Sequence, residues 1–210
     1  MSAGASRAAG GIGPKRCHHP RAIFRYNPST MRVLGVDPGL KATGYGVIDY
    51  EAGRCRLVEG GVIETAAAAE LAERLARIYA GVESVARQFQ PDVAVVESLY
   101  AKYRSPRTAL LMSHARGVVL LALAHCGVEV VSYPASLVKR ALAGHGRAAK
   151  RQVAGMVAQV LGISMDAVPD HVSDALAIAI CHSTPWAAGW GQRPAWREPQ
   201  VRFLQRGRRV

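Results

Sequence analysis

The amino-acid sequence predicts an α/β fold, in which a mixed five-stranded sheet carries helices on both faces. Short apolar runs bounded by turn residues indicate the strands, and longer stretches with a helical period accompany them. Three strands come first and are joined by short turns, which is typical of an antiparallel meander. Helices precede the last two strands, so these two and the first strand can be parallel neighbours.

The first strand ends in the feature on which the site prediction depends. In the segment MRVLGVDPG an apolar run stops at Asp37, and the Pro-Gly pair after it favours a tight turn. Gly44 and Gly46 in the second strand leave room for another segment to approach the backbone closely. In chain order, the strands are expected over residues 32–36, 43–50, 56–65, 92–96 and 128–133.

The helices are predicted from apolar spacing and from end signals. Leu71, Leu75 and Ile78 recur at spacings of four and three, which marks one face of an amphipathic helix. Ser105 followed by Pro106 is a typical helix start, with an N-cap and then proline at the first helical position. In chain order, the helices are expected over residues 67–88, 105–125, 136–142, 147–161 and 171–182.

The formal charge of +12 is concentrated at the two ends of the chain. Residues 31–184 carry 16 basic and 14 acidic residues, so the overall charge is weak support for a nucleic-acid-binding face. We expect a disordered basic leader over residues 1–30, upstream of the true start, one domain over residues 31–184 and an irregular basic tail over residues 185–210. No apolar run approaches the roughly 20 residues that span a bilayer, and the four cysteines lack metal or redox spacing. We therefore expect a non-membrane protein with free thiols.

Acidic residues recur at positions that the fold would bring together. Glu97 ends the fourth strand as Asp37 ends the first, and adjacent parallel strands would deliver both carboxylates to the edge where α/β sheets bind ligands. His171 and Asp174 are three residues apart and share one helix face. Several carboxylates in one place need a cation between them, and such oxygen ligands suit Mg²⁺ or Mn²⁺. Two ions about 4 Å apart can activate a water and stabilise the leaving oxygen of an in-line displacement.

Each of these residues also has a structural interpretation. Asp37 could accept hydrogen bonds from the turn amides, Asp174 could interact with the helix dipole, and His171 could be a solvated residue of the first turn. A shared site explains them better, because separate accidents would otherwise have to place acids at two strand ends and one helix start.

Six segments, in family order, resemble the RuvC family of Holliday-junction resolvases, the crossover-junction endodeoxyribonucleases. The matching pieces are VLGVDPGLKATGYGVI, RLARIYAGV, FQPDVAVVES, HARGVVL, YPASLVKRALAGHGRAAKRQV and DHVSDALAIAICH. The resemblance implies a ribonuclease H-like fold and a cytoplasmic homodimer that makes paired symmetric nicks in four-way DNA junctions during recombination and repair. It also implies two Mg²⁺ or Mn²⁺ ions per active site and a branch-migration complex of RuvA and RuvB as partner.

The same resemblance implies roles for individual residues. Asp37, Glu97, His171 and Asp174 would be the catalytic metal ligands. Some members carry Asp where this chain has His171, and the neighbouring Asp170 is the competing candidate for that ligand position.

Three further positions match family residues that contact or face DNA. Tyr100 matches an aromatic residue used against DNA bases, where stacking contributes about 1–3 kcal/mol per base. Lys139 and Lys150 match basic positions near the cleft and could neutralise phosphate charge. The helix that begins at Ser105 would carry the dimer contact.

Two other functions stay open at this point. Actin-like ATPases and acetate or sugar kinases also place an aspartate at the end of a first strand before a Gly-containing hairpin, although those proteins need a second lobe to close over ATP. A catalytically silent junction-binding protein is the second alternative. Its site would lack an acid, whereas all four positions here carry residues able to bind a metal.

Overall fold

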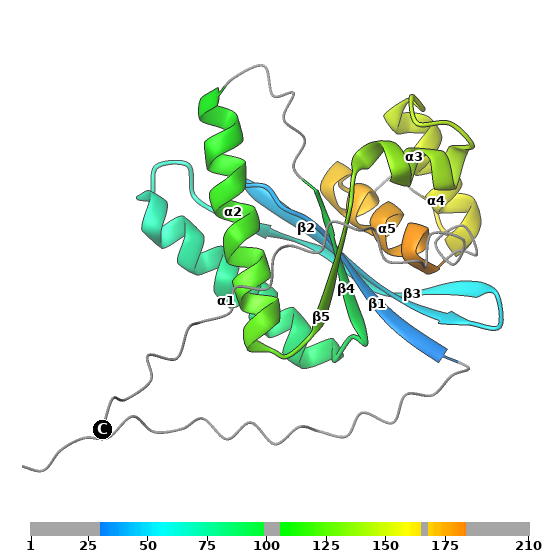
Figure 1. The fold of residues 1–210 in the computed structure, drawn as a ribbon, viewed down its shortest axis with the longest axis horizontal. Coiled ribbons are helices and arrows are strands. Elements are labelled where there is room, and N and C mark those ends of the chain that lie inside the picture. The colour runs from blue at the N-terminus through cyan, green and yellow to red at the C-terminus, as the bar shows by residue number, and fades with distance from the viewer. Residues whose placement is uncertain (1–29, 99–105, 165–167, 184–210) are drawn as a thin grey trace, which may run out of the picture.

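Five strands form one mixed sheet in the computed structural model of the chain, which describes residues 30–98, 106–164 and 168–183 (Figure 1). The strands are β1 (Thr30–Asp37), β2 (Ala42–Glu51), β3 (Arg54–Glu64), β4 (Val93–Glu97) and β5 (Glu129–Tyr133). They lie in the order β3-β2-β1-β4-β5. The β1–β2 and β2–β3 pairs are antiparallel, and the β1–β4 and β4–β5 pairs are parallel. Both parts of the predicted topology, the meander and the parallel neighbours, are confirmed.

Helices cover both faces of this sheet, as predicted. They are α1 (Leu71–Phe89), α2 (Pro106–His125), α3 (Ala135–Ala143), α4 (Lys150–Leu161) and α5 (Asp170–Ser183). Figure 1 shows α1 and α2 on one side of the sheet and α3, α4 and α5 on the other. Two buried apolar clusters correspond to these two layers, one including Ile78, Val119 and Leu123, the other including Val138, Val157 and Ile178.

Two helices begin later than the sequence predicts. Helix α1 begins at Leu71 and not at residue 67, because Thr65 at the end of β3 is held by hydrogen bonds to Leu40 and Lys41 and the chain must turn before a helix can start. Helix α4 begins at Lys150 and not at residue 147. There the side chain of Gln152 accepts a hydrogen bond from the Ala149 N–H at 2.9 Å and so defines the helix start.

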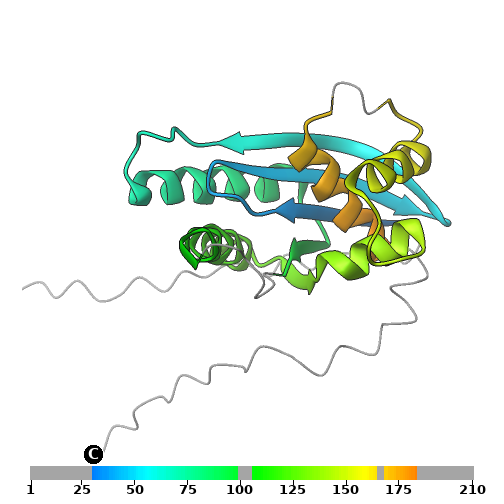
Figure 2. The same ribbon diagram turned by 90° about the horizontal axis from the view of Figure 1, so that it is seen from above.

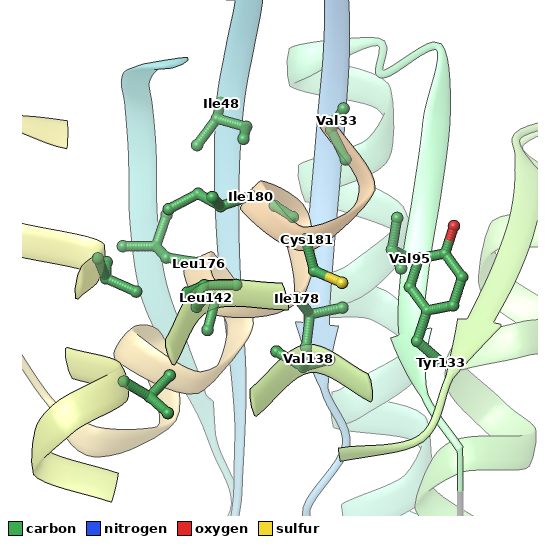
Figure 3. Close-up of a cluster of buried hydrophobic side chains, with 14 of the residues drawn as sticks. Val33, Ile48, Val95, Tyr133, Val138, Leu142, Leu176, Ile178, Ile180 and Cys181 are labelled. Atoms are coloured by element: carbon green, nitrogen blue, oxygen red, sulfur yellow. The ribbon is translucent and has the colours of Figure 1, made fainter. Parts of the chain in front are cut away.

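Helix α5 packs unusually close to the sheet because glycines lie beneath it. A side chain at Gly35 would collide with the backbone of Ala175, and one at Gly46 would collide with Leu176. Figure 3 shows apolar side chains of α5, Ile178 among them, lying between the strands and α3. Helix α5 is therefore held by apolar contacts with the strands and with α3, and by the close approach of its backbone to β1.

An ion-pair cluster joins β1, β2 and β3 near the start of β1, at the far end of that strand from Asp37. The buried carboxylate of Asp49 lies 2.7 Å from Arg32 Nε and 2.7 Å from Arg56 Nη2. Hydrogen bonding to Arg32 holds the pKa of Asp49 below its ordinary value. Arg32 also donates to the carbonyl oxygen of Phe89, which ties the end of α1 to the sheet.

Helix α2 has two different faces. Ala115, Val119 and Leu123 are fully buried against the core, whereas Leu110 and Leu121 are 64% and 49% exposed. Figure 2 shows the helix end-on at the margin of the molecule. Within the described part of the chain, α2 alone is long and apolar enough to cross a membrane by length and composition. The prediction from uninterrupted apolar runs missed this length because Ser113, His114 and Arg116 break the run. The buried face of α2 packs against α1 and β5.

Candidate metal-dependent active site

Asp37 and Glu97 emerge side by side at one edge of the sheet. In the parallel β1–β4 pair Val36 is opposite Val96, so the next residue of each strand is the acid with which the strand ends. The side chain of Asp37 is only 14% exposed. The sequence prediction that both carboxylates reach the same edge is confirmed by this register.

Helix α5 brings its first turn to the same edge. Gly44 is opposite Asp37 in the β1–β2 hairpin, and a side chain at Gly44 would collide with the backbone of His171. The absence of a side chain there lets His171 Nδ1 lie 2.8 Å from Asp37 Oδ2. Asp174, one turn further along α5, is near enough to Asp37 and Glu97 to raise the pKa of both carboxyls.

The carboxylates repel one another in a poorly solvated place. Burial, together with the charges of Asp37 and Asp174, raises the pKa of Glu97 to about 7. Burial also raises the pKa of Asp37, and the hydrogen bond from His171 opposes that shift. A site that disfavours its own negative charges in this way gains most from a bound cation.

Two lysines partly compensate this negative charge. Lys150, the first residue of α4, places its Nζ 2.8 Å from Asp174 Oδ2 and 3.3 Å from Asp170 Oδ2. Desolvation opposes its charged form, but the hydrogen bonds to both aspartates leave the pKa of Lys150 above its ordinary value. Lys139 on α3 is also near enough to lower the pKa of Glu97. Both basic residues named from the sequence thus lie close to the acids.

The competing candidates for the fourth ligand differ in position. His171 is hydrogen-bonded to Asp37, whereas Asp170 is paired with Lys150 and its side chain is 81% exposed. The geometry therefore favours His171 as the residue beside the buried acids.

The donor set fits a divalent ion, although it is not arranged as a finished cage. In the described ranges, no three His, Cys, Asp or Glu residues stand with the spacing of ligands around one ion. Two of the acids are paired with other side chains, since Asp37 contacts His171 and Asp174 contacts Lys150. Asp37, Glu97, Asp174 and His171 would hold the ion, and three carboxylates with one imidazole are ligands that Mn²⁺ and Mg²⁺ accept.

The loop after Asp37 is fixed by buried polar contacts. Thr43 is fully buried, and its hydroxyl donates to the carbonyl oxygen of Gly39 at 2.8 Å. Arg74 on α1 donates to Leu40 O and Thr65 Oγ1. The turn that follows the acid is thus tied to β2, β3 and α1, which keeps Asp37 in place.

One residue near the site was not singled out by the sequence prediction. Arg116 on α2 donates from Nε to the carbonyl oxygen of Glu97 at 3.1 Å and from Nη2 to Ser132 Oγ at 2.8 Å. Its place inside HARGVVL, one of the segments that resemble the family, was the available signal. Tyr100, the predicted base-stacking residue, lies outside the described residues.

Comparison with known proteins agrees with this architecture. The family model described as crossover junction endodeoxyribonuclease RuvC matches residues 33–182. A protein of that name from Moorella thermoacetica is 44% identical over 163 residues, which cover 78% of this chain and 96% of the relative. The structure of Thermus thermophilus RuvC in complex with Holliday junction substrate is similar with a TM-score of 0.70 and 41% identity, covering 77% of this chain and 96% of that one. The yeast mitochondrial Holliday junction resolvase Ydc2 shares the fold at a TM-score of 0.59, with 14% identity over 78% of this chain and 81% of its own.

The sheet order and the acidic edge define a nuclease of the ribonuclease H-like class. Within this class the match extends over most of the chain in sequence as well as in fold. The chain belongs to the RuvC family of crossover junction endodeoxyribonucleases, which depend on divalent metal ions.

Proposed function

We propose that this protein resolves four-way DNA junctions by cutting two strands of like polarity, with Asp37, Glu97, His171 and Asp174 as its metal ligands. The observation that carries the assignment is the side-by-side emergence of Asp37 and Glu97 beneath the first turn of α5. The RuvC relatives support the reaction, and the Thermus thermophilus complex supports the junction as substrate. The family relationship does not favour the ATPase alternative or the silent junction binder.

The chain's own groups have distinct tasks in this proposal. Two Mg²⁺ or Mn²⁺ ions, when bound, supply an activated water and stabilise the leaving oxygen of the phosphodiester. Asp37 and Glu97, on rigid strand ends, fix the position of the site. His171 and Asp174 approach from α5, where Asp174 first has to release the Lys150 ammonium.

In this proposal the two lysines of the site interact with the DNA backbone. Lys150, once it is separated from Asp174, can interact with a phosphate oxygen, and Lys139 adds positive charge to the same edge. Tyr100 would stack on a base near the cut, a role that rests on the family resemblance.

We also propose a domain range, a homodimer and a partner complex for the enzyme. Residues 31–184 form the nuclease domain, and the exposed apolar face of α2 contacts a second copy of the chain. Paired symmetric nicks require two such sites. A branch-migration complex of RuvA and RuvB delivers the junction in the cytoplasm.

A labelled four-way junction tests the assignment of the acids. With Mn²⁺, the wild-type protein should release nicked duplex, and Asp37→Asn, Glu97→Gln and Asp174→Asn should each cut at least about 100-fold more slowly. The same variants should still shift the junction in Ca²⁺, because removing an acid does not weaken attraction to phosphate. Full cleavage by any of the three would contradict its place in the site.

The fourth ligand has a matched pair of variants on adjacent residues. His171→Ala should reduce cleavage strongly, whereas Asp170→Asn should change it less than about threefold, since Asp170 is exposed and its carboxylate is paired with Lys150. The opposite result would make Asp170 the ligand.

A further inference from the structure

Arg116 connects three elements at the point where Glu97 leaves the sheet. It lies on α2 beside the fully buried Ala115, and its half-buried guanidinium reaches the carboxyl ends of both β4 and β5. Its Nε donates to the main-chain carbonyl oxygen of Glu97 at 3.1 Å, and its Nη2 donates to Ser132 Oγ at 2.8 Å. These donors sit on different nitrogens of one planar group, so both bonds together fix its orientation.

The end of β4 is held from two directions. The N–H of Ser98 donates to the carbonyl oxygen of Tyr133 at 2.9 Å, which fixes the strand toward β5. The bond from Arg116 fixes the same peptide toward α2. Between them, these contacts determine the direction in which the Glu97 side chain leaves the backbone.

Glu97 needs such support more than an ordinary strand residue does. Its strand ends beside that of Asp37, and Asp37 and Asp174 are both near enough for their charges to repel its carboxylate. Without a fixed backbone, the side chain would relieve this repulsion by turning away from the other acids. A displacement of about 1 Å in a catalytic group can reduce a rate about 100-fold.

We propose that Arg116 is a positioning residue for catalysis, which holds the main chain of Glu97 so that its carboxylate points toward the shared metal site. The role rests on the proposed function of Glu97 as a metal ligand. Arg116 acts through the carbonyl group of Glu97, and Ser132 acts by orienting the guanidinium.

The experiment measures metal dependence and junction binding separately. Arg116→Lys keeps the charge but cannot make both bonds in the same geometry. We expect its single-turnover cleavage of a saturating four-way junction to fall about 10- to 100-fold and the Mn²⁺ concentration for half-maximal rate to rise by a similar factor. Ser132→Ala should shift the same midpoint less, and the double variant should be no worse than Arg116→Lys alone, because both act through one contact.

Two controls separate positioning of Glu97 from a general loss of stability and from a direct DNA contact. Arg87→Lys, which changes an exposed arginine paired with Glu83 on α1, should leave rate and midpoint unchanged. Junction affinity in Ca²⁺ should stay within about twofold of wild type in all variants, since no DNA contact is removed.

Three outcomes would overturn the inference. An unchanged Mn²⁺ midpoint with a lowered melting temperature would make Arg116 purely structural, and loss of junction binding would make it a DNA contact. An unchanged rate in both Arg116→Lys and Ser132→Ala would remove its role altogether. Glu97→Gln distinguishes failure of the proposed function, because an active Glu97→Gln enzyme would refute the metal site itself, whatever Arg116 does.

Discussion

At the scale of single residues, Glu97 shows most clearly why the site favours a bound metal ion. It ends a buried strand, so its position is dictated by the sheet, and yet its charge is opposed by burial and by two other acids. A folded protein tolerates such an arrangement at functional sites, where a ligand supplies the missing charge. The buried charge of Glu97 should therefore lower the stability of the metal-free protein.

Glu97→Gln should stabilise the metal-free protein at high pH and not at low pH. The pKa of Glu97 is raised from 4.5 to about 7, so the folded state retains a proton that the unfolded chain releases. The free energy of unfolding should therefore fall as pH rises through this window, by at most about 3 kcal/mol, and glutamine should abolish this loss. Urea unfolding in EDTA at pH 5 and pH 8 measures the difference.

Exposed Glu73 on α1 provides the control for this experiment. Glu73→Gln removes an exposed carboxylate from the first turn of α1, so it measures what the loss of one negative charge does without any change in buried charge. At pH 8, Mn²⁺ should stabilise the wild type more than Glu97→Gln. Equal pH dependence of wild type and Glu97→Gln would show that the carboxyl is not buried among like charges.

At the scale of elements, the position of α5 is decided by the glycines beneath it. Gly44 and Gly46 come two residues apart on β2 and point to the face on which α5 lies, and each meets an atom of α5. Because α5 carries two of the proposed ligands, the distance between helix and strand sets the geometry of the site. A small change in the strand should therefore act on the metal site as well as on packing.

Gly44→Ala should damage activity more than stability. The added methyl group would collide with the backbone of His171 and move the first turn of α5 away from Asp37. We expect unfolding to become easier by about 1–3 kcal/mol and cleavage to slow by about 100-fold, with a weaker response to Mn²⁺. Cleavage assays and urea unfolding on the same preparation separate the two effects.

The matched control is Gly155→Ala on the exposed side of α4. An added methyl group there meets nothing within 4 Å, and alanine favours the helix by about 1 kcal/mol. This variant should be more stable than wild type and fully active. If Gly44→Ala kept wild-type cleavage, close approach of α5 would not matter for the site.

At the scale of the whole molecule, α2 has one face packed in the core and one apolar face exposed on the surface. One face packs on α1 and the sheet and places Arg116 against Glu97, while the other exposes Leu110 and Leu121. Large apolar side chains that share an exposed helix face are typical of protein contacts. The proposed homodimer would cover this face and leave the acidic edge of each sheet free for DNA.

Replacing Leu110 and Leu121 together by Glu should separate the two copies. Charges on both sides of a two-fold contact repel each other, so light scattering should give the mass of one chain where the wild type gives two. On a plasmid with an extruded cruciform, the variant should produce nicked circles in place of linear DNA, because paired cutting needs two sites. Val160→Glu, at an apolar residue 39% exposed on α4, should keep both mass and linear product.

A variant that stays dimeric would place the contact on another surface. A monomeric variant that still linearises the plasmid would show that paired cutting does not depend on this dimer.

Much of this protein could be predicted from local sequence alone. Five strands and five helices follow from periods of apolar residues and from turn signals, because both depend on neighbours within a few positions. The two errors, at the starts of α1 and α4, occurred where a distant or side-chain hydrogen bond defined the helix start. Asp37 and Glu97 could be placed at one edge because parallel strands end together.

The tertiary structure decided what no local pattern contains. The sequence indicated space above Gly44 but not that α5 would occupy it, and it named Lys150 without its pairing to Asp174. The hydrogen bond from Arg116 to Glu97 joins residues 19 positions apart on different elements, and burial raises the pKa of Glu97 only once the sheet and helices have excluded water. Strand ends and helix faces are properties of neighbouring residues, whereas charge repulsion, desolvation and cross-element contacts exist only when distant segments are packed together.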